Sequence, residues 1–342
     1  MSRIFPATRD GLSLGLGGAP LGNMYSAISD DDAQILLDMI HSDGCATFDT
    51  APHYGNGRSE QRFGALLARV PRESITLSTK VGRLLTPSPS APKDYGAYVD
   101  VLPNMQHFDY SASGVRRSIK DSLNRLGVQH IDVAYVHDCS VMTHGDRAAA
   151  VLQQVIQEAI PELQRLRKEG LVHRIGIAVS HWQTCVAVLR EMDLDCLLLA
   201  GRYTLLDQSA LPELLPLCQA KNVKIALGGA FNSGILATGV SKALQPLRFN
   251  YEDAPPDLVA RAAKIERVCE EHDVPLRAAA LQFPLANPAI EIVLAGVKSP
   301  EHWTDAVAKM RHPITPEFWH ALRRESLISE TTPTPVSSAS VP

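Results

Sequence analysis

Short, continuous apolar runs recur along the chain and alternate with longer segments in which apolar residues repeat at helical spacing. Continuous runs of this length are typical of strands that are covered on both faces, as in a parallel sheet. The runs predict eight strands, at residues 14–18, 45–49, 75–80, 131–137, 175–179, 196–200, 223–227 and 290–294.

Apolar stripes between these runs predict helices, and capping residues mark several of their ends. Ser29 with Asp32 three residues later is typical of a helix start, and Gly44 and Gly127 are typical of helix ends. The helices are predicted at residues 29–43, 59–67, 111–126, 151–169 with a restart at Pro161, 183–192, 211–221, 257–272, 276–286, 300–310 and 316–326. Eight strand–helix units favour an α/β fold of the (β/α)₈ TIM-barrel type, although periodicity alone is also compatible with an open parallel sheet.

The segments outside these units divide into ends and long loops. Turn residues around Asp10 predict a short N-terminal hairpin in residues 1–14. We predict one catalytic barrel domain over residues 1–328, closed by extra C-terminal helices, and a disordered tail rich in Thr, Pro and Ser over residues 329–342. We expect the substrate wall to be formed by the loops at 84–110 and 231–255 and by the segment after His137, because the loops of such barrels set substrate specificity.

Composition narrows the class of protein. Of 342 residues, 45% are hydrophobic and 20% are charged, which is the balance of a folded globular chain. The net charge of −4 comes without a basic patch, so we expect no nucleic-acid or membrane partner. No signal peptide and no apolar stretch of about 18 residues is recognisable, and we expect a cytoplasmic protein.

Two common kinds of site are not predicted. The six cysteines are scattered without a CxxC pair, which disfavours disulfides and structural zinc, so no metal site is predicted. Gly15, Gly17 and Gly18 resemble the start of a dinucleotide fingerprint, but Pro20 stands where the third glycine is required. A Rossmann motif is therefore rejected.

Four residues with complementary chemistry follow predicted strands. Asp49, Lys80 and His137 end three successive strands, and Tyr54 lies in the first of the loops that follow. In a parallel barrel these strand ends lie on one face, where the catalytic groups of such barrels are found. The sequence therefore predicts that the four side chains meet.

The charges of these residues suggest acid–base chemistry. A tyrosine hydroxyl, with an ordinary pKa of about 10, exchanges protons near neutral pH only if its anion is stabilised, and Lys80 supplies the cation. Asp49 supplies the counter-charge that a buried ammonium needs, and His137 can hydrogen-bond a substrate oxygen. Each residue alone has an ordinary structural explanation, and the hypothesis depends on the four together.

The same residues lie in motifs that resemble the aldo-keto reductase superfamily. The motifs are Phe48-Asp49-Thr50-Ala51 with Tyr54-Gly55 and Ser59-Glu60, Ser78-Thr79-Lys80, Gly114 to Gly127, and Ile131-Asp132 up to His137-Asp138. The resemblance covers residues 12 to 310. It implies a barrel enzyme that uses a nicotinamide cofactor, with Tyr54 as general acid/base, Asp49 and Lys80 tuning it, and His137 orienting the carbonyl or hydroxyl.

Two further stretches, Ala200 to Asp207 and Gly228 to Leu236, are similar to the NAD-dependent aldose 1-dehydrogenases (L-fucose, L-galactose or D-arabinose type) and to pyridoxal 4-dehydrogenase. The resemblance implies oxidation of a cyclic hemiacetal to a lactone, on a small-molecule substrate that is either a sugar or pyridoxal. The alternatives are a general NADPH-dependent aldehyde or ketone reductase and a non-catalytic nucleotide-sensing subunit.

The resemblance also implies a set of cofactor-binding residues. The match to the family is weaker at these positions, because His181 and Ala200 stand where the family has Asn and Gln. Phe231 is expected to replace the aromatic residue that stacks on the nicotinamide ring. His302 replaces the arginine that grips a 2′-phosphate, which favours NAD over NADP, while Lys298 keeps NADP as the alternative. The expected cofactor-binding residues are Ser180, Phe231, Asn232, Gly234, Gly296, Lys298, Ser299, His302 and Asp305.

Overall fold

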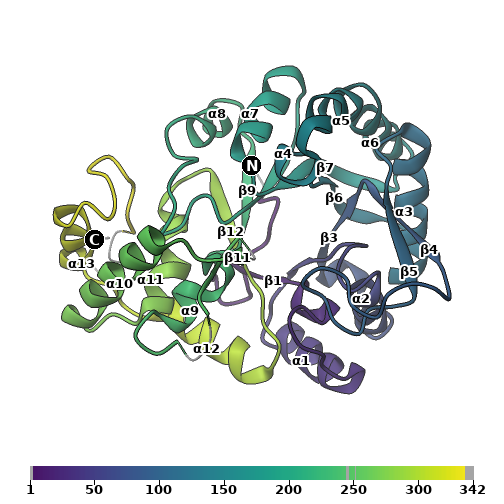
Figure 1. Ribbon diagram of the computed structural model, residues 1–342. Coiled ribbons are helices and arrows are strands. Elements are labelled where there is room, and N and C mark those ends of the chain that lie inside the picture. Colours follow the sequence, from purple (N-terminus) through teal and green to yellow (C-terminus); the bar gives the residue numbers. More distant parts are fainter. Residues whose placement is uncertain (1–2, 244–245, 251, 336–342) are drawn as a thin grey trace.

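The computed structural model describes residues 3–243, 246–250 and 252–335, and a closed barrel of eight parallel strands forms its centre (Figure 1). Around the barrel the strands are β1 (Leu14–Gly17), β12 (Ile290–Ala295), β9 (Lys224–Gly228), β8 (Cys196–Ala200), β7 (Val172–Val179), β6 (Ile131–His137), β3 (Thr76–Val81) and β2 (Thr47–Asp49). All eight predicted strands are present, and the (β/α)₈ barrel is confirmed.

Helices surround the barrel in the predicted alternation (Figure 1). Ser29 and Ser111 cap two of them by accepting hydrogen bonds from the N–H groups of Asp32 and Gly114, and Gly127 ends the second in a left-handed conformation. The helices are α1 (Asp30–Ser42), α2 (Arg58–Leu67), α3 (Ala112–Leu126), α4 (Val141–His144), α5 (Ala148–Gln154), α6 (Ile160–Lys168), α7 (Trp182–Glu191), α8 (Leu214–Ala220), α9 (Ile235–Thr238), α10 (Pro256–Glu271), α11 (Leu276–Gln282), α12 (Pro300–Arg311) and α13 (Pro316–Arg324). A π-helical turn, Val155–Ala159, joins α5 to α6.

The predicted N-terminal hairpin is wrong for residues 3–13, which form a tight turn without a strand ladder. Instead, this segment closes one end of the barrel. The N–H groups of Ile4 and Phe5 both donate to Glu291 Oε2 at 2.9 Å, and the Phe5 ring is buried among inward-facing side chains of the strands. Burial of the Phe5 ring stabilises this arrangement, whereas an isolated two-stranded hairpin is only marginally stable in water.

The other chain end also differs in part from its prediction. Residues 329–335 contact α13: Arg323 donates to the Thr332 carbonyl at 2.9 Å and to Thr334 Oγ1 at 3.0 Å, and Thr332 is buried. This part of the predicted disordered tail is therefore held in place, and residues 336–342 lie outside the described residues. The single-domain boundary stays a prediction.

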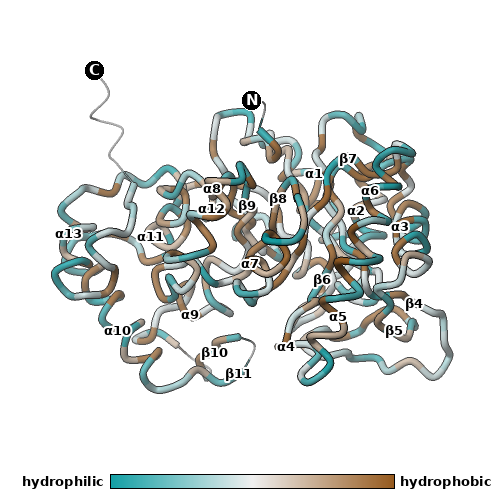
Figure 2. The backbone as a smooth tube through the Cα atoms, turned by 90° about the horizontal axis from the view of Figure 1, so that it is seen from above, coloured by the Kyte–Doolittle hydropathy of each residue, from teal (hydrophilic) through white to brown (hydrophobic). Residues whose placement is uncertain are grey.

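The two predicted long loops contain small antiparallel pairs. β4 (Arg83–Pro87) pairs with β5 (Asn104–Phe108), and β10 (Arg248–Phe249) pairs with β11 (Glu252–Asp253). Figure 2 shows both pairs, with α4, gathered on one side of the barrel. Within the described residues, no helix is long and apolar enough to cross a membrane.

Candidate active site

The register of the barrel strands brings the predicted polar residues together. Asp49 lies beside Ser78 in the β2–β3 pair, and Lys80 lies beside Tyr135 in the β3–β6 pair. Because side chains two residues apart on a strand share a face, Lys80 lies on the same face as Ser78 and within reach of Asp49.

Lys80 and Asp49 form a buried ion pair. Lys80 Nζ is 2.7 Å from Asp49 Oδ2 and donates to the Thr50 carbonyl at 2.8 Å, while Ser78 Oγ donates to Asp49 Oδ1 at 2.6 Å. Burial acts against charge on both groups: it lowers the pKa of Lys80 and raises the pKa of Asp49. The ion pair opposes both shifts, and the Ser78 hydroxyl also opposes the shift of Asp49, so each charge is stabilised mainly by its partner.

Tyr54 lies directly against this pair. Lys80 Nζ is 4.6 Å from the centre of the Tyr54 ring. The turn that presents Tyr54 is held by close packing, since a Cβ on Gly22 would lie 2.4 Å from the Tyr54 carbonyl carbon. His137 meets the Tyr54 ring edge-to-face, with ring centres 6.1 Å apart and planes at 85°. The four residues predicted to meet therefore do so.

His137 is kept in its uncharged form. Burial, followed by the nearby cations of Arg83 and Lys80, holds the pKa of His137 well below its ordinary value of 6.5. The next residue, Asp138, has a left-handed backbone with φ of 49° and pairs with Arg83 at 2.8 Å. A neutral His137 can hydrogen-bond a substrate oxygen without adding a positive charge.

His53 is a site residue that the sequence reasoning missed. Its ring lies 6.0 Å from that of His137 and 5.1 Å from that of Tyr98. Gln106 Nε2 donates to Asn56 Oδ1, so Gln106 Oε1 is the acceptor for His53 Nδ1 at 3.0 Å. This assigns the proton to Nδ1 and leaves Nε2 as an acceptor. Nothing local marks His53 in the sequence, because Gln106 comes from the distant strand β5.

Burial gives His53 a testable effect on stability. Burial, followed by Arg83, lowers the pKa of His53 to about 3 from 6.5. The unfolded chain therefore binds more protons between these values, and the free energy of unfolding falls as the pH drops through this window. In urea unfolding at about pH 7.5 and about pH 5, His53→Gln should lose part of this pH dependence, whereas the exposed control His320→Gln should keep it. An unchanged dependence in His53→Gln would contradict a neutral, buried His53.

A cavity of about 270 Å³ opens over these side chains. Its wall includes Ala97 and Tyr98 from the loop at 84–110 and Asp138 from the segment after His137, which are two of the three segments expected to form the substrate wall. Of the expected cofactor residues, Ser180 lies here. The lining residues are Ala19, Met24, His53, Tyr54, Lys80, Ala97, Tyr98, His137, Asp138, Ala178, Val179, Ser180, Leu198 and Ala200.

A second cavity, of about 630 Å³, shares Ala97 with the first. It lies between Tyr25 and residues 96–99 on one side and residues 233–243 and 246–248 on the other. Its lining includes the cations Lys242 and Arg248 and the turn at Ser233 and Gly234, both of which have a positive φ. An elongated anionic molecule that extends from the first cavity would meet these charges.

The three expected cofactor-binding residues near this turn, Phe231, Asn232 and Gly234, lie in different surroundings. Gly234 lines the second cavity, where a Cβ would meet no atom within 4 Å. Asn232 is buried and holds the turn by accepting from Thr204 Oγ1 at 2.6 Å and donating to the Gly201 carbonyl at 3.0 Å. Phe231 lines neither cavity and packs against the barrel core, so the structure does not place it where a nicotinamide-stacking aromatic would lie.

The remaining expected residues surround the start of α12. Ser299 caps the helix through the His302 N–H, and Gly296 packs closely against Pro20. Lys298 Nζ donates to Ser26 Oγ at 2.6 Å and to the Met24 carbonyl.

Asp305, three residues after His302 on α12, pairs with Arg277 at 3.0 Å and with Lys309 at 3.4 Å. The charges near α12 are therefore largely engaged within the protein.

The chain is similar to known proteins in sequence and in fold. The model of the aldo/keto reductase family matches residues 13–325. The chain is 42% identical to pyridoxal 4-dehydrogenase of Microbacterium luteolum, over 93% of this chain and 94% of that protein. It is 37% identical to D-threo-aldose 1-dehydrogenase of a Pseudomonas species, over 94% of this chain and 95% of that protein.

The solved structure of a glycerol dehydrogenase from Gluconobacter oxydans has the same fold, with a TM-score of 0.69 at 20% identity over 99% of this chain and 98% of that one. Because the family model spans most of the chain and both dehydrogenases align over nearly their full length, the chain belongs to the aldo/keto reductase family and is an oxidoreductase.

Proposed function

We propose that the protein oxidises a cyclic hemiacetal to a lactone with NAD, at the site formed by Asp49, Lys80, Tyr54 and His137. The observation that supports this most strongly is the position of Lys80, which contacts Asp49 at 2.7 Å and the Tyr54 ring at 4.6 Å at the base of one cavity. This arrangement stabilises a tyrosine anion, which is the base that removal of a hydroxyl proton requires.

The side chains would act in one concerted step. As the C–H bond at the hemiacetal carbon breaks, the hydroxyl proton passes to the Tyr54 oxygen and a C=O bond forms. His137, which is neutral, donates a hydrogen bond to the same substrate oxygen and orients it. A bound nicotinamide supplies the acceptor for the two electrons that leave as hydride.

The described residues fit such a cofactor, and members of this family use nicotinamide cofactors. The first cavity has room for a ring beside the substrate, and Lys242 and Arg248 in the second cavity suit a pyrophosphate. We propose NAD because a 2′-phosphate near α12 would meet Asp305, while the nearby cations are engaged: Arg277 is paired with Asp305, and Lys298 with Met24 and Ser26.

This cofactor preference predicts the effect of one charge. Asp305→Asn should raise kcat/KM for NADP about twofold to fivefold and leave that for NAD unchanged, since one partly exposed charge is worth up to about 1 kcal/mol. Steady-state kinetics at low and high salt measure this, and the gain should shrink with salt. Glu191→Gln, which removes an exposed charge on α7, is the matched control. An equal gain in both variants would show that Asp305 does not face the 2′-position.

Within the hemiacetals, the cavity wall favours pyridoxal as the first substrate. Met24, Ala97 and Tyr98 present an apolar and aromatic surface that suits a flat pyridine ring. The 42% identical relative is a pyridoxal 4-dehydrogenase, which supports the same choice. An aldose is the second candidate, because His53 Nε2 can accept a hydrogen bond from a sugar hydroxyl and a 37% identical relative is an aldose dehydrogenase.

A substrate panel separates these possibilities. The purified protein should reduce NAD with pyridoxal or with one of L-fucose, L-galactose and D-arabinose. Reduction of simple aldehydes by NADPH, without turnover of any of these hemiacetals, would instead support a general carbonyl reductase. Cofactor binding without any turnover would support a nucleotide-sensing role.

A further inference from the structure

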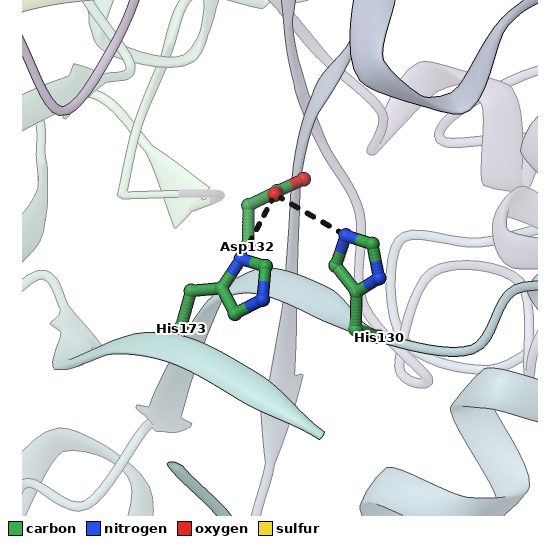
Figure 3. A group of neighbouring side chains, drawn as sticks. All are labelled: His130, Asp132 and His173. Atoms are coloured by element: carbon green, nitrogen blue, oxygen red, sulfur yellow. Dashed lines mark ion pairs between the residues drawn. The ribbon is translucent and has the colours of Figure 1, made fainter. Parts of the chain in front are cut away.

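Two histidines and an aspartate converge on neighbouring strands (Figure 3). They lie at the end of β6 that is opposite His137. His130 precedes β6, Asp132 is the second residue of β6, and His173 is the second residue of β7. The strand register pairs Ile131 with Val172, which brings Asp132 beside His173 although 41 residues separate them in the chain.

Both imidazoles face one carboxylate oxygen. His173 Nδ1 lies 3.5 Å and His130 Nε2 lies 3.8 Å from Asp132 Oδ1, and the three ligand atoms lie within 4.8 Å of one another. The two rings stack with centres 4.5 Å apart. These nitrogen–oxygen distances are too long for good hydrogen bonds. They are close to the separation of about 3–3.5 Å between ligands that bind one zinc ion at about 2.0–2.2 Å.

The second oxygen of Asp132 is already held by the protein. Asp132 Oδ2 accepts from Arg72 Nη2 at 2.6 Å and from the Leu77 N–H at 2.8 Å. Such contacts fix the orientation of a carboxylate and leave its other oxygen to a metal, as the outer contacts of metal ligands commonly do.

We propose that His130, Asp132 and His173 bind a divalent transition-metal ion of the zinc type, with solvent completing the coordination. Two imidazole nitrogens and one carboxylate oxygen are a ligand set that suits zinc and its neighbours. Arg72, which binds the second oxygen of Asp132, helps to hold the carboxylate in this orientation. The Arg72 cation also repels a dication, so we expect micromolar rather than nanomolar affinity.

The bound ion would tie β6 to β7 at the base of the barrel. His130 and His137 lie at the two ends of β6, about 23 Å apart at about 3.3 Å per residue. Zinc at this site should therefore stabilise the fold without displacing substrate. The proposal is independent of the proposed hemiacetal chemistry.

Calorimetric titration of the full, metal-free chain with zinc chloride tests the proposal. The wild type should bind one zinc ion and melt about 2–5 °C higher at saturating zinc. His173→Gln and His130→Gln should each weaken binding at least about tenfold, which is the smallest usual loss for a partner in a metal site. The His173 side chain is 52% exposed, so its replacement should leave the fold intact, and circular dichroism checks this.

The control is His320→Gln, an exposed histidine on α13 that should leave zinc binding unchanged. Failure of the wild type to bind zinc at micromolar concentrations would overturn the proposal. Undiminished binding in both His130→Gln and His173→Gln would also overturn it, because the ion would then lie elsewhere.

Discussion

Replacing Tyr54 with phenylalanine should lower kcat about 10²- to 10⁴-fold, the usual loss when one general acid/base is removed. The phenyl ring keeps the packing of the Tyr54 ring against Lys80 and His137. Only the hydroxyl is lost, so cofactor binding and the melting temperature should change little. Stopped-flow measurement of NADH formation in a single turnover isolates the chemical step.

The matched control is Tyr135→Phe, which removes a hydroxyl from the barrel interior. Tyr135 is buried and its hydroxyl contacts the Cys196 sulfur, away from the first cavity. The Tyr135→Phe variant should retain a near-normal kcat. Activity of Tyr54→Phe within a few-fold of the wild type would remove Tyr54 from the role of proton carrier.

Replacing Lys80 with methionine should lower both activity and stability. Methionine leaves the Asp49 carboxylate buried without its cation, and breaking a buried ion pair costs about 3–5 kcal/mol of the free energy of unfolding. Activity should fall about as far as in Tyr54→Phe, on the order of 10²- to 10⁴-fold, because the tyrosine anion loses its stabilising charge. Urea unfolding and turnover measure the two effects separately.

The double variant Asp49→Asn/Lys80→Met distinguishes the two roles of the pair. With both charges removed, most of the lost stability should return, since replacing a whole buried ion pair is often nearly neutral. Activity should not return. Recovery of activity together with stability would show that Lys80 acts only through folding and does not tune Tyr54.

The sequence predicted the fold well because strand and helix signals are local. The bounds of β6 and β8 equal the predicted 131–137 and 196–200. β7 begins at Val172, three residues before the predicted start, because His173 and Arg174 interrupt the apolar run at the exposed strand end. The meeting of Asp49, Tyr54, Lys80 and His137 also followed from strand order alone.

Several residues could not be assigned from the sequence, because their roles depend on contacts between distant segments. His53 becomes a neutral acceptor only because Gln106 on β5 binds its other nitrogen. Lys298 matches a phosphate-binding position, yet its ammonium contacts Met24 and Ser26. Likewise, the His130 and His173 rings meet only through the β6–β7 register. None of these contacts produces a periodic pattern in the sequence.

We propose that hydride leaves the hemiacetal carbon while Tyr54 takes the hydroxyl proton. Pyridoxal and an L-fucose-type aldose, each carrying deuterium at that carbon, should be incubated with the wild-type protein and NAD, and both products analysed by mass spectrometry. We expect the deuterium in the reduced nicotinamide and a lactone as the other product, from at least one of the two substrates. Unlabelled NADH, or no lactone from either substrate, would contradict the proposed reaction.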